Sequence, residues 1–260
     1  MAAAAGNDPR RASGRCNWRR GILGLVLLAA GATAGEPGGD PRQVYSAAAP
    51  PWMAAVGRLD VPGSRFQEGR HTHHREECSA TLVARGSSRA ADTIVTAWHC
   101  LEFYDDLSRP ITFTLLPGLA GEVAREAYRL ADGGGMHADW AILRLYRPVT
   151  TRTVAPLTVA AAAADRHRPL VMAGYSRDDG LGDGGRRLTF DPACRVTAEA
   201  AGRTDTDCRA HKGASGGAVI QLSEQGEPQL MGVISSGDGV GTSAFVPVTR
   251  FRAALTLHLR

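Results

Sequence analysis

Five consecutive residues, Thr96-Ala97-Trp98-His99-Cys100, form the most informative segment of this chain. They close a short apolar run over residues 93–97, and comparable runs recur between residues 53 and 248, separated by Gly, Asp, Pro and Ser. Many short runs at close spacing are typical of an all-β barrel or sandwich rather than of alternating strands and helices. An Ala- and Thr-rich stretch over 148–167 divides the runs into two sets. We therefore expect two β domains, over 52–150 and 165–260.

The two ends of the chain predict other structures. Residues 1–34 combine an arginine-rich start, an apolar run over 22–30 and Ala32-Thr33-Ala34, which is typical of a secretory signal peptide cleaved after Ala34. The apolar run is shorter than the ~20 residues of a membrane span, so an uncleaved membrane anchor is the weaker alternative. No stable membrane insertion is expected once the leader is removed. Residues 35–51 are rich in Gly, Pro and Ala and predict a flexible arm or a short propeptide. Apolar residues at helical spacing predict a helix over 249–259.

Charge gives no indication of a nucleic-acid partner. The chain has 30 Lys and Arg and 26 Asp and Glu, and residues 1–34 hold five of the basic residues and one acidic residue. Residues 35–260 therefore carry 25 of each, and no basic patch with interleaved aromatic residues is present to suggest nucleic-acid binding. The predicted signal peptide indicates a secreted or periplasmic protein. Since no tethering domain is recognisable, a simple soluble protein is expected, and we expect it to be a monomer.

The cysteines predict disulfides. One of the five, Cys16, falls in the leader, which leaves Cys78, Cys100, Cys194 and Cys208 for an oxidising compartment. Four cysteines allow three pairings, of which the pairing of neighbours along the chain is the simplest. A zinc site is the alternative, but no C-x-x-C pair supports it.

Two further segments accompany the histidine segment. They are Asp139-Trp140-Ala141-Ile142-Leu143 and Gly213-Ala214-Ser215-Gly216-Gly217. A serine hydroxyl is a poor nucleophile at neutral pH, so it needs a base with a pKa near 7 and a third group that holds the tautomer of that base. His99, Asp139 and Ser215 supply these three roles in that chain order.

The three segments resemble the trypsin/chymotrypsin family of serine proteases. The family's histidine lies in T-A-x-H-C, its aspartate opens D-x-A-x-L and its serine lies in G-x-S-G-G, and all three patterns match here. The likeness covers roughly residues 52–250, and the segment 40–52 looks like the secreted bacterial branch that includes the glutamyl endopeptidases. The resemblance implies two six-stranded antiparallel β-barrels with a short C-terminal helix. It also implies an endopeptidase that hydrolyses proteins or peptides through an acyl-enzyme, without cofactor or metal.

The resemblance also assigns roles to residues outside the triad. The N–H groups of Gly213 and Ser215 are expected to form the oxyanion hole. The expected substrate-binding residues are Arg209, Ser235, Ser236 and Gly237, and Ser235 is also expected to donate a hydrogen bond to Asp139. Arg209 occupies the position that forms the pocket floor in the trypsin group, and Ile234 stands where glutamyl endopeptidases carry a histidine, so the preferred substrate side chain stays unassigned.

The sequence also leaves other modes of activation, another function and a metal site to be considered. Ala214 stands where many animal members of the family have an aspartate that pairs with a newly cut N-terminus, so activation of that kind is not expected. A catalytically inactive binding protein on the protease scaffold is the rival function. Three histidines and two glutamates lie close together ahead of Cys78 and could indicate a metal site, but a solvated polar loop is the favoured interpretation. These residues are His71, His73, His74, Glu76 and Glu77.

Overall fold

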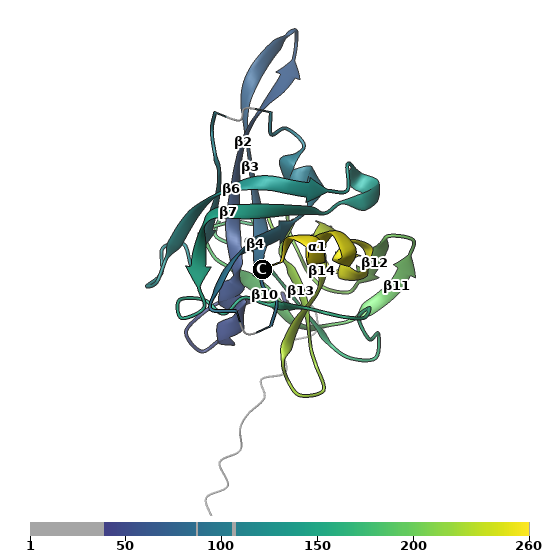
Figure 1. The fold of residues 1–260 in the computed structure, drawn as a ribbon. Helices are drawn as coiled ribbons and strands as arrows, with labels where there is room; N and C mark the ends of the chain where they lie inside the picture. The colour runs from purple at the N-terminus through teal and green to yellow at the C-terminus, as the bar shows by residue number, and fades with distance from the viewer. Residues whose placement is uncertain (1–38, 87, 106–107, 260) are drawn as a thin grey trace, which may run out of the picture. The chain divides into compact units, whose positions relative to one another are not determined.

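The computed structural model describes residues 39–86, 88–105 and 108–259, and the predicted signal peptide lies outside these residues. The described strands form one closed barrel and a second, larger sheet (Figure 1). No helix in the described part of the chain is long and apolar enough to cross a membrane.

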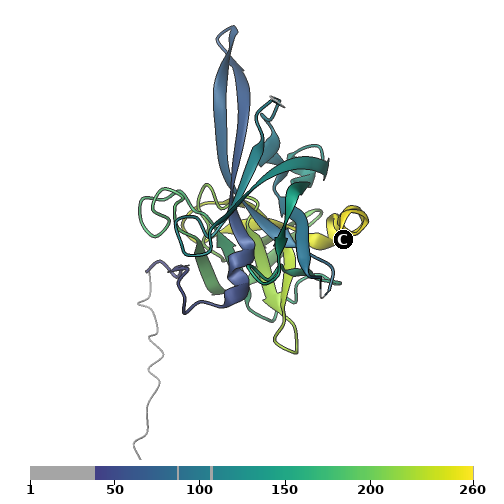
Figure 2. The ribbon, with the colours of Figure 1, turned by 60° about the vertical axis from the view of Figure 1, so that its left-hand side comes forward.

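The N-terminal half forms a closed antiparallel barrel in the order β2-β3-β4-β7-β6-β5. Its strands are β2 (Val56–Gln67), β3 (Arg70–Val83), β4 (Ala90–Thr96), β5 (Ile111–Leu115), β6 (Val123–Asp132) and β7 (Ala141–Thr150). Side chains alternate across each strand, so that Leu59 and Val61 of β2 are buried while Arg58 is partly exposed. The far half of the β2–β3 hairpin extends beyond the other strands of the barrel (Figures 1 and 2).

The C-terminal half is a nine-stranded sheet with the order β1-β10-β9-β13-β14-β15-β12-β11, in which β8 also pairs with β14. Its strands are β1 (Gln43–Val44), β8 (Thr158–Val159), β9 (Leu170–Gly174), β10 (Thr189–Cys194), β11 (Val196–Ala200), β12 (Arg203–Thr206), β13 (Ala218–Leu222), β14 (Pro228–Gly237) and β15 (Ser243–Pro247). Only Arg195 separates β10 from β11, so one bent strand pairs with β9 on one side and β12 on the other. The sheet thereby curls into the second barrel.

Short helical elements complete the fold. Four are 3-10 turns, namely η1 (Pro51–Ala55), η2 (Trp98–Leu101), η3 (Met136–Ala138) and η4 (Val248–Arg250), and the α-helix α1 spans Arg252–His258. The helix α1 contacts the first barrel, where Arg144 of β7 donates a hydrogen bond to the His258 carbonyl at 2.7 Å. The predicted all-β double-barrel class with a short C-terminal helix is confirmed.

Within the described N-terminal segment, residues 39–50, the stretch from Asp40 to Tyr45 is held against the second barrel, whereas most of residues 46–50 are exposed. Gln43 and Val44 pair with Thr189 and Phe190 of β10, and the Arg42 side chain is 2% exposed. Its Gly- and Pro-rich composition predicts flexibility because it carries few apolar groups, but ion pairs and backbone hydrogen bonds hold it instead.

Candidate active site

His99 lies on η2, immediately after β4 of the first barrel. The turn is held at its start by Thr96, whose hydroxyl donates to the Ser79 carbonyl of β3 at 2.8 Å. It is held again at Cys100, which forms a disulfide with Cys78 of β3. The second disulfide joins Cys194 to Cys208, so both pairings of chain neighbours are confirmed. The ring of His99 is thus carried by a short turn tied to β3 at two points.

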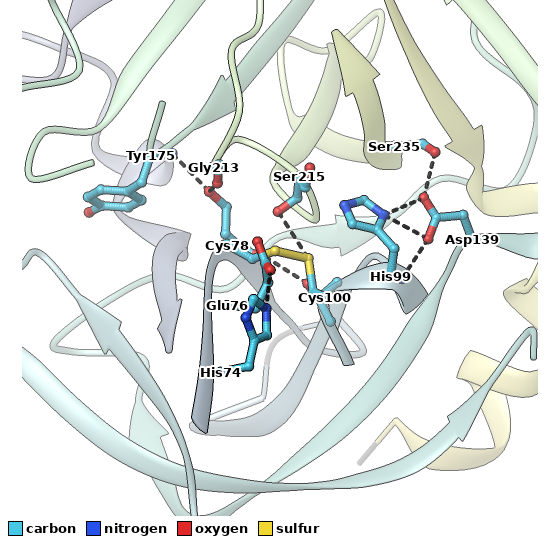
Figure 3. The surroundings of a disulfide bond; sticks show 12 residues. His74, Glu76, Cys78, His99, Cys100, Asp139, Tyr175, Gly213, Ser215 and Ser235 are labelled. Carbon is cyan, nitrogen blue, oxygen red and sulfur yellow. Dashed lines mark hydrogen bonds and ion pairs between the residues drawn. A yellow bond between two sulfur atoms is a disulfide. The ribbon is translucent and has the colours of Figure 1, made fainter. Parts of the chain in front are cut away.

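Asp139 lies between η3 and β7 and is completely buried, with a side-chain exposure of 0%. Its Oδ1 accepts from the His99 backbone N–H at 2.9 Å, and its Oδ2 lies 2.9 Å from the ring nitrogen Nδ1. The Ser235 hydroxyl of β14 donates to the same Oδ2 at 2.5 Å, as the sequence predicts (Figure 3). A carboxylate facing Nδ1 favours the tautomer protonated there, which leaves a lone pair on Nε2.

Ser215 lies in the loop between β12 and β13, which belongs to the second barrel. Its carbonyl accepts from the Ser79 backbone N–H of the first barrel at 2.8 Å, and it also lies 3.8 Å from Cys100 Sγ. These contacts place Ser215 beside the turn that carries His99 (Figure 3). Among the described residues, the Ser215 hydroxyl has no hydrogen bond to His99, and such bonds commonly tighten only when substrate is bound.

The two expected oxyanion-hole amides have no acceptor. Gly213 has a φ of +95°, which favours glycine, and its carbonyl accepts from the Ser79 hydroxyl at 2.9 Å. Within the described residues, neither the Gly213 N–H nor the Ser215 N–H donates a hydrogen bond. Both donors are therefore available to an incoming oxygen.

Ser79 of β3 is a site residue that the sequence does not reveal. Its side chain is fully buried, donates to the Gly213 carbonyl and accepts from the Tyr175 N–H at 2.8 Å. Its N–H donates to the Ser215 carbonyl and its own carbonyl accepts from Thr96. Three of these four hydrogen bonds join Ser79 to the second barrel, and the one from Thr96 lies within the first. Its position directly after Cys78 is the one available signal, because a serine on a strand has no motif of its own.

The expected substrate-binding residues adopt a closed arrangement. Arg209 Nε donates to the Gly239 carbonyl at 2.7 Å, and the Gly239 N–H donates to the Ala210 carbonyl at 3.1 Å. A Cβ on Gly237 would lie 2.4 Å from the Ala210 oxygen, so the two segments touch there. Ser236 is half-buried on the same strand. The segments that carry Arg209 and Gly237 are therefore in direct contact with each other.

Two titratable groups beside Arg209 have shifted pKa values. Burial raises the pKa of Asp191, whose Oδ2 accepts from the Arg209 N–H at 3.0 Å. Burial and then the positive charge of Arg42 lower the pKa of His211, which favours the neutral ring.

The polar cluster considered as a metal site lies along β3. His74 Nε2 lies 2.9 Å from Glu76 Oε2, and His71 Nδ1 lies 3.4 Å from the Ser64 hydroxyl. Within the described residues, one group of three or more potential ligands lies close enough to share an ion, and it consists of Cys78, His99 and Cys100. Both sulfurs of that group are consumed in the disulfide, so they offer no thiolate ligand.

The sequence matches one known protein family. The model of that family, described as "Trypsin-like peptidase domain", matches residues 78–233. That range includes His99, Asp139 and Ser215. No curated protein sequence matches the chain.

Solved protease structures have a similar fold. The protease Anisep of Arthrobacter nicotinovorans is similar with a TM-score of 0.59 and 17% identity over 83% of this chain and 99% of that chain. The active form of the Rv3671c protease of M. tuberculosis has a TM-score of 0.56 and 19% identity over 79% of this chain and 81% of that one. The thermostable serine protease AL20, from an extremophilic microorganism, has a TM-score of 0.57 and 16% identity over 80% and 99%. At these identities the likeness concerns the fold.

Proposed function

Because the chain belongs to the trypsin-like peptidase family, we propose that this serine protease is an exported endopeptidase that uses His99, Asp139 and Ser215 as its catalytic triad. The observation that carries the proposal is the buried Asp139 carboxylate, which contacts both the ring and the backbone N–H of His99. A fully buried carboxylate is costly unless it is paired, and here its partners are groups that a triad requires.

The proposed reaction proceeds in two steps. His99 Nε2 accepts the Ser215 hydroxyl proton while the serine oxygen attacks the peptide carbonyl, and Asp139 stabilises the imidazolium that forms. His99 then donates that proton to the leaving amine, which leaves an acyl group on Ser215. Water, activated by the same nitrogen, hydrolyses the ester and regenerates the serine. These groups supply the proton transfers without a cofactor.

The oxyanion of each tetrahedral intermediate is proposed to bind to the N–H groups of Gly213 and Ser215. The absence of acceptors for both groups among the described residues supports this role. One such donor contributes about 3 kcal/mol to transition-state stabilisation in other proteases. Ser235 is proposed to hold Asp139 in place through its hydrogen bond to Oδ2. Arg209, Ser236 and Gly237 are proposed to contact the substrate side chain.

Export is proposed from the predicted signal peptide over 1–34. The two disulfides support a location outside the cytoplasm, because reducing compartments rarely keep such bonds. A casein-hydrolysis assay of the purified protein tests the proposed activity, with His99→Ala and Ser215→Ala as separate controls. Hydrolysis that both substitutions abolish supports the endopeptidase. Equal hydrolysis by Ser215→Ala contradicts it, and no hydrolysis by the folded native chain favours the inactive binding protein.

A further inference from the structure

The segment 39–50 contains a buried cation with no role in the triad. Arg42 donates to both oxygens of Asp40, and its two terminal nitrogens lie 2.8 and 3.0 Å from the two oxygens of Asp178. Its side chain is 2% exposed and that of Asp178 is 13% exposed. A buried guanidinium satisfied by two carboxylates fixes both partners in position, because removing either leaves an unpaired charge. Arg42 therefore joins the N-terminal segment to Asp178.

Asp178 organises the loop over residues 177–185, here named the Asp178 loop. Its Oδ2 accepts from the Gly182 N–H at 3.3 Å and its carbonyl accepts from the Gly184 N–H at 3.0 Å. The hydrogen bonds from Arg42 lower the pKa of Asp178 to about 2, so this carboxylate is charged at neutral pH. The conformation of the loop thus depends on the residue that Arg42 binds.

The Asp178 loop reaches the oxyanion hole through its first residue. The Arg177 N–H donates to the Lys212 carbonyl at 2.6 Å. That carbonyl belongs to the same peptide unit as the Gly213 N–H, and in a trans peptide the two groups point in opposite directions. Fixing the Lys212 carbonyl toward Arg177 therefore fixes the direction of the Gly213 N–H.

The next carbonyl along the chain is held as well. The Ser79 hydroxyl donates to the Gly213 carbonyl at 2.9 Å, so Gly213 is fixed on both sides, by Arg177 from the second barrel and by Ser79 from the first. Because glycine has no Cβ, Gly213 reaches its φ of +95° without strain and could also adopt other values. The residue itself therefore gives little preference for one orientation of the preceding peptide. Its orientation is therefore set by these contacts.

We infer that Arg42 is a positioning residue for the oxyanion hole: its contact with Asp178 orders the loop whose Arg177 N–H orients the Lys212–Gly213 peptide. The inference rests on the proposed function and adds a residue of the N-terminal segment that affects the geometry of the oxyanion hole. Asp178 gives the N-terminal segment a carboxylate partner that Ala214 cannot offer. Asp40 also lies close to a proposed substrate-binding residue, because its Oδ1 is 3.9 Å from Arg209 Nε.

The inference is tested on the purified protein with Arg42→Ala and Asp178→Asn. The readouts are kcat and KM for a peptide substrate and the inhibition constant of a peptide aldehyde, whose bound hemiacetal carries the oxyanion. The matched control is Arg144→Ala, which breaks a similarly buried pair with Asp92 in the first barrel. Losing one oxyanion donor lowers kcat by about 10²–10³-fold in other proteases, so partial misorientation should lower it at least tenfold.

The expected result is a tenfold or greater fall in both kcat and aldehyde affinity for the two variants, with KM changed less than threefold. Arg144→Ala should lower the melting temperature but leave kcat within about twofold. Equal kcat and aldehyde affinity in Asp178→Asn and the native protein would overturn the inference, even if Arg42→Ala failed to fold. Absence of any Ser215 reactivity in the native protein would instead overturn the proposed function, and the inference with it.

Discussion

Asp139 holds His99 by both of its carboxylate oxygens, with Oδ1 accepting from the His99 backbone N–H at 2.9 Å and Oδ2 facing the ring Nδ1 at 2.9 Å. One side chain therefore fixes the position of the turn and the orientation of the ring together. Because the carboxylate is completely buried, no water competes for these contacts.

Replacing Asp139 with Asn tests the tautomer that this contact selects. The amide N–H₂ of the introduced side chain can face Nδ1 only when Nδ1 accepts, which places the proton on Nε2 and removes the base. The expected result is a fall in kcat of about 10⁴-fold, the size seen for this change in other triads. Stopped assays on a peptide substrate measure it, and Asp205→Asn, at a surface pair with Arg203, is the control. A loss below tenfold in folded Asp139→Asn contradicts the assignment.

Removing the Ser79 hydroxyl is expected to reduce both stability and activity. The Ser79→Ala substitution leaves the Tyr175 N–H without its buried acceptor, which costs about 1–3 kcal/mol in the free energy of unfolding. It also frees the Gly213 carbonyl, so kcat should fall together with stability. Urea unfolding and peptide hydrolysis measure the two effects. Ser88→Ala, at a partly buried hydroxyl that bonds the Ala90 carbonyl, should change neither by much. An unchanged urea midpoint in Ser79→Ala would show that its hydrogen bonds contribute nothing.

Gly216 is expected to tolerate no side chain. A Cβ there would lie 2.0 Å from Thr96 Oγ1 and 2.3 Å from the Ser79 carbonyl, and its φ is +78°. Gly216→Ala should therefore lose more than about 2 kcal/mol of unfolding free energy and most activity. Gly226→Ala is the matched control, because Gly226 has a φ of +83° with no atom within 4 Å of its Cβ position. Chemical denaturation should show a loss of only about 1 kcal/mol there. Equal losses at the two positions would mean that backbone strain, not the contact between the barrels, explains both.

Acidification should weaken the Arg42–Asp178 contact. The pKa of Asp178 is lowered from its usual 3.8 to about 2, first by its hydrogen bonds with Arg42. A carboxylate with a lowered folded-state pKa contributes stability that is present above about pH 4 and is lost as the pH falls toward about 2. Melting temperatures at about pH 6 and about pH 2 should therefore differ less in Asp178→Asn than in the native protein. Parallel pH curves for the two proteins would contradict this contribution of Asp178.

The fold class could be predicted from the sequence, and the candidate triad could be proposed from it, because both rest on local signals. The three segments around His99, Asp139 and Ser215 each carry several residues whose types are constrained by one turn or strand. Short apolar runs likewise indicate strands without knowledge of their partners. The disulfide pairing followed the same logic, since both bonds join cysteines that are neighbours along the chain.

The supporting contacts were not accessible, because they join distant residues that share no pattern. Arg42 and Asp178 are 136 positions apart, and Ser79 and Gly213 are 134 apart. Several of these contacts use backbone atoms, which every residue possesses, so residue type carries no record of them. The contacts of residues 40–45 could not be predicted either, because composition says nothing about Asp178, the distant carboxylate that binds Arg42.

The most direct test of the central claim is mass spectrometry of the purified protein after reaction with a fluorophosphonate probe. A serine activated by His99 should be labelled at close to one probe per chain, with the adduct on the peptide containing Ser215. Ser215→Ala should show no adduct, and Asp139→Asn should react far more slowly. Folded protein with both disulfides intact that takes up no probe, or that is labelled equally after Ser215→Ala, would contradict a catalytic Ser215.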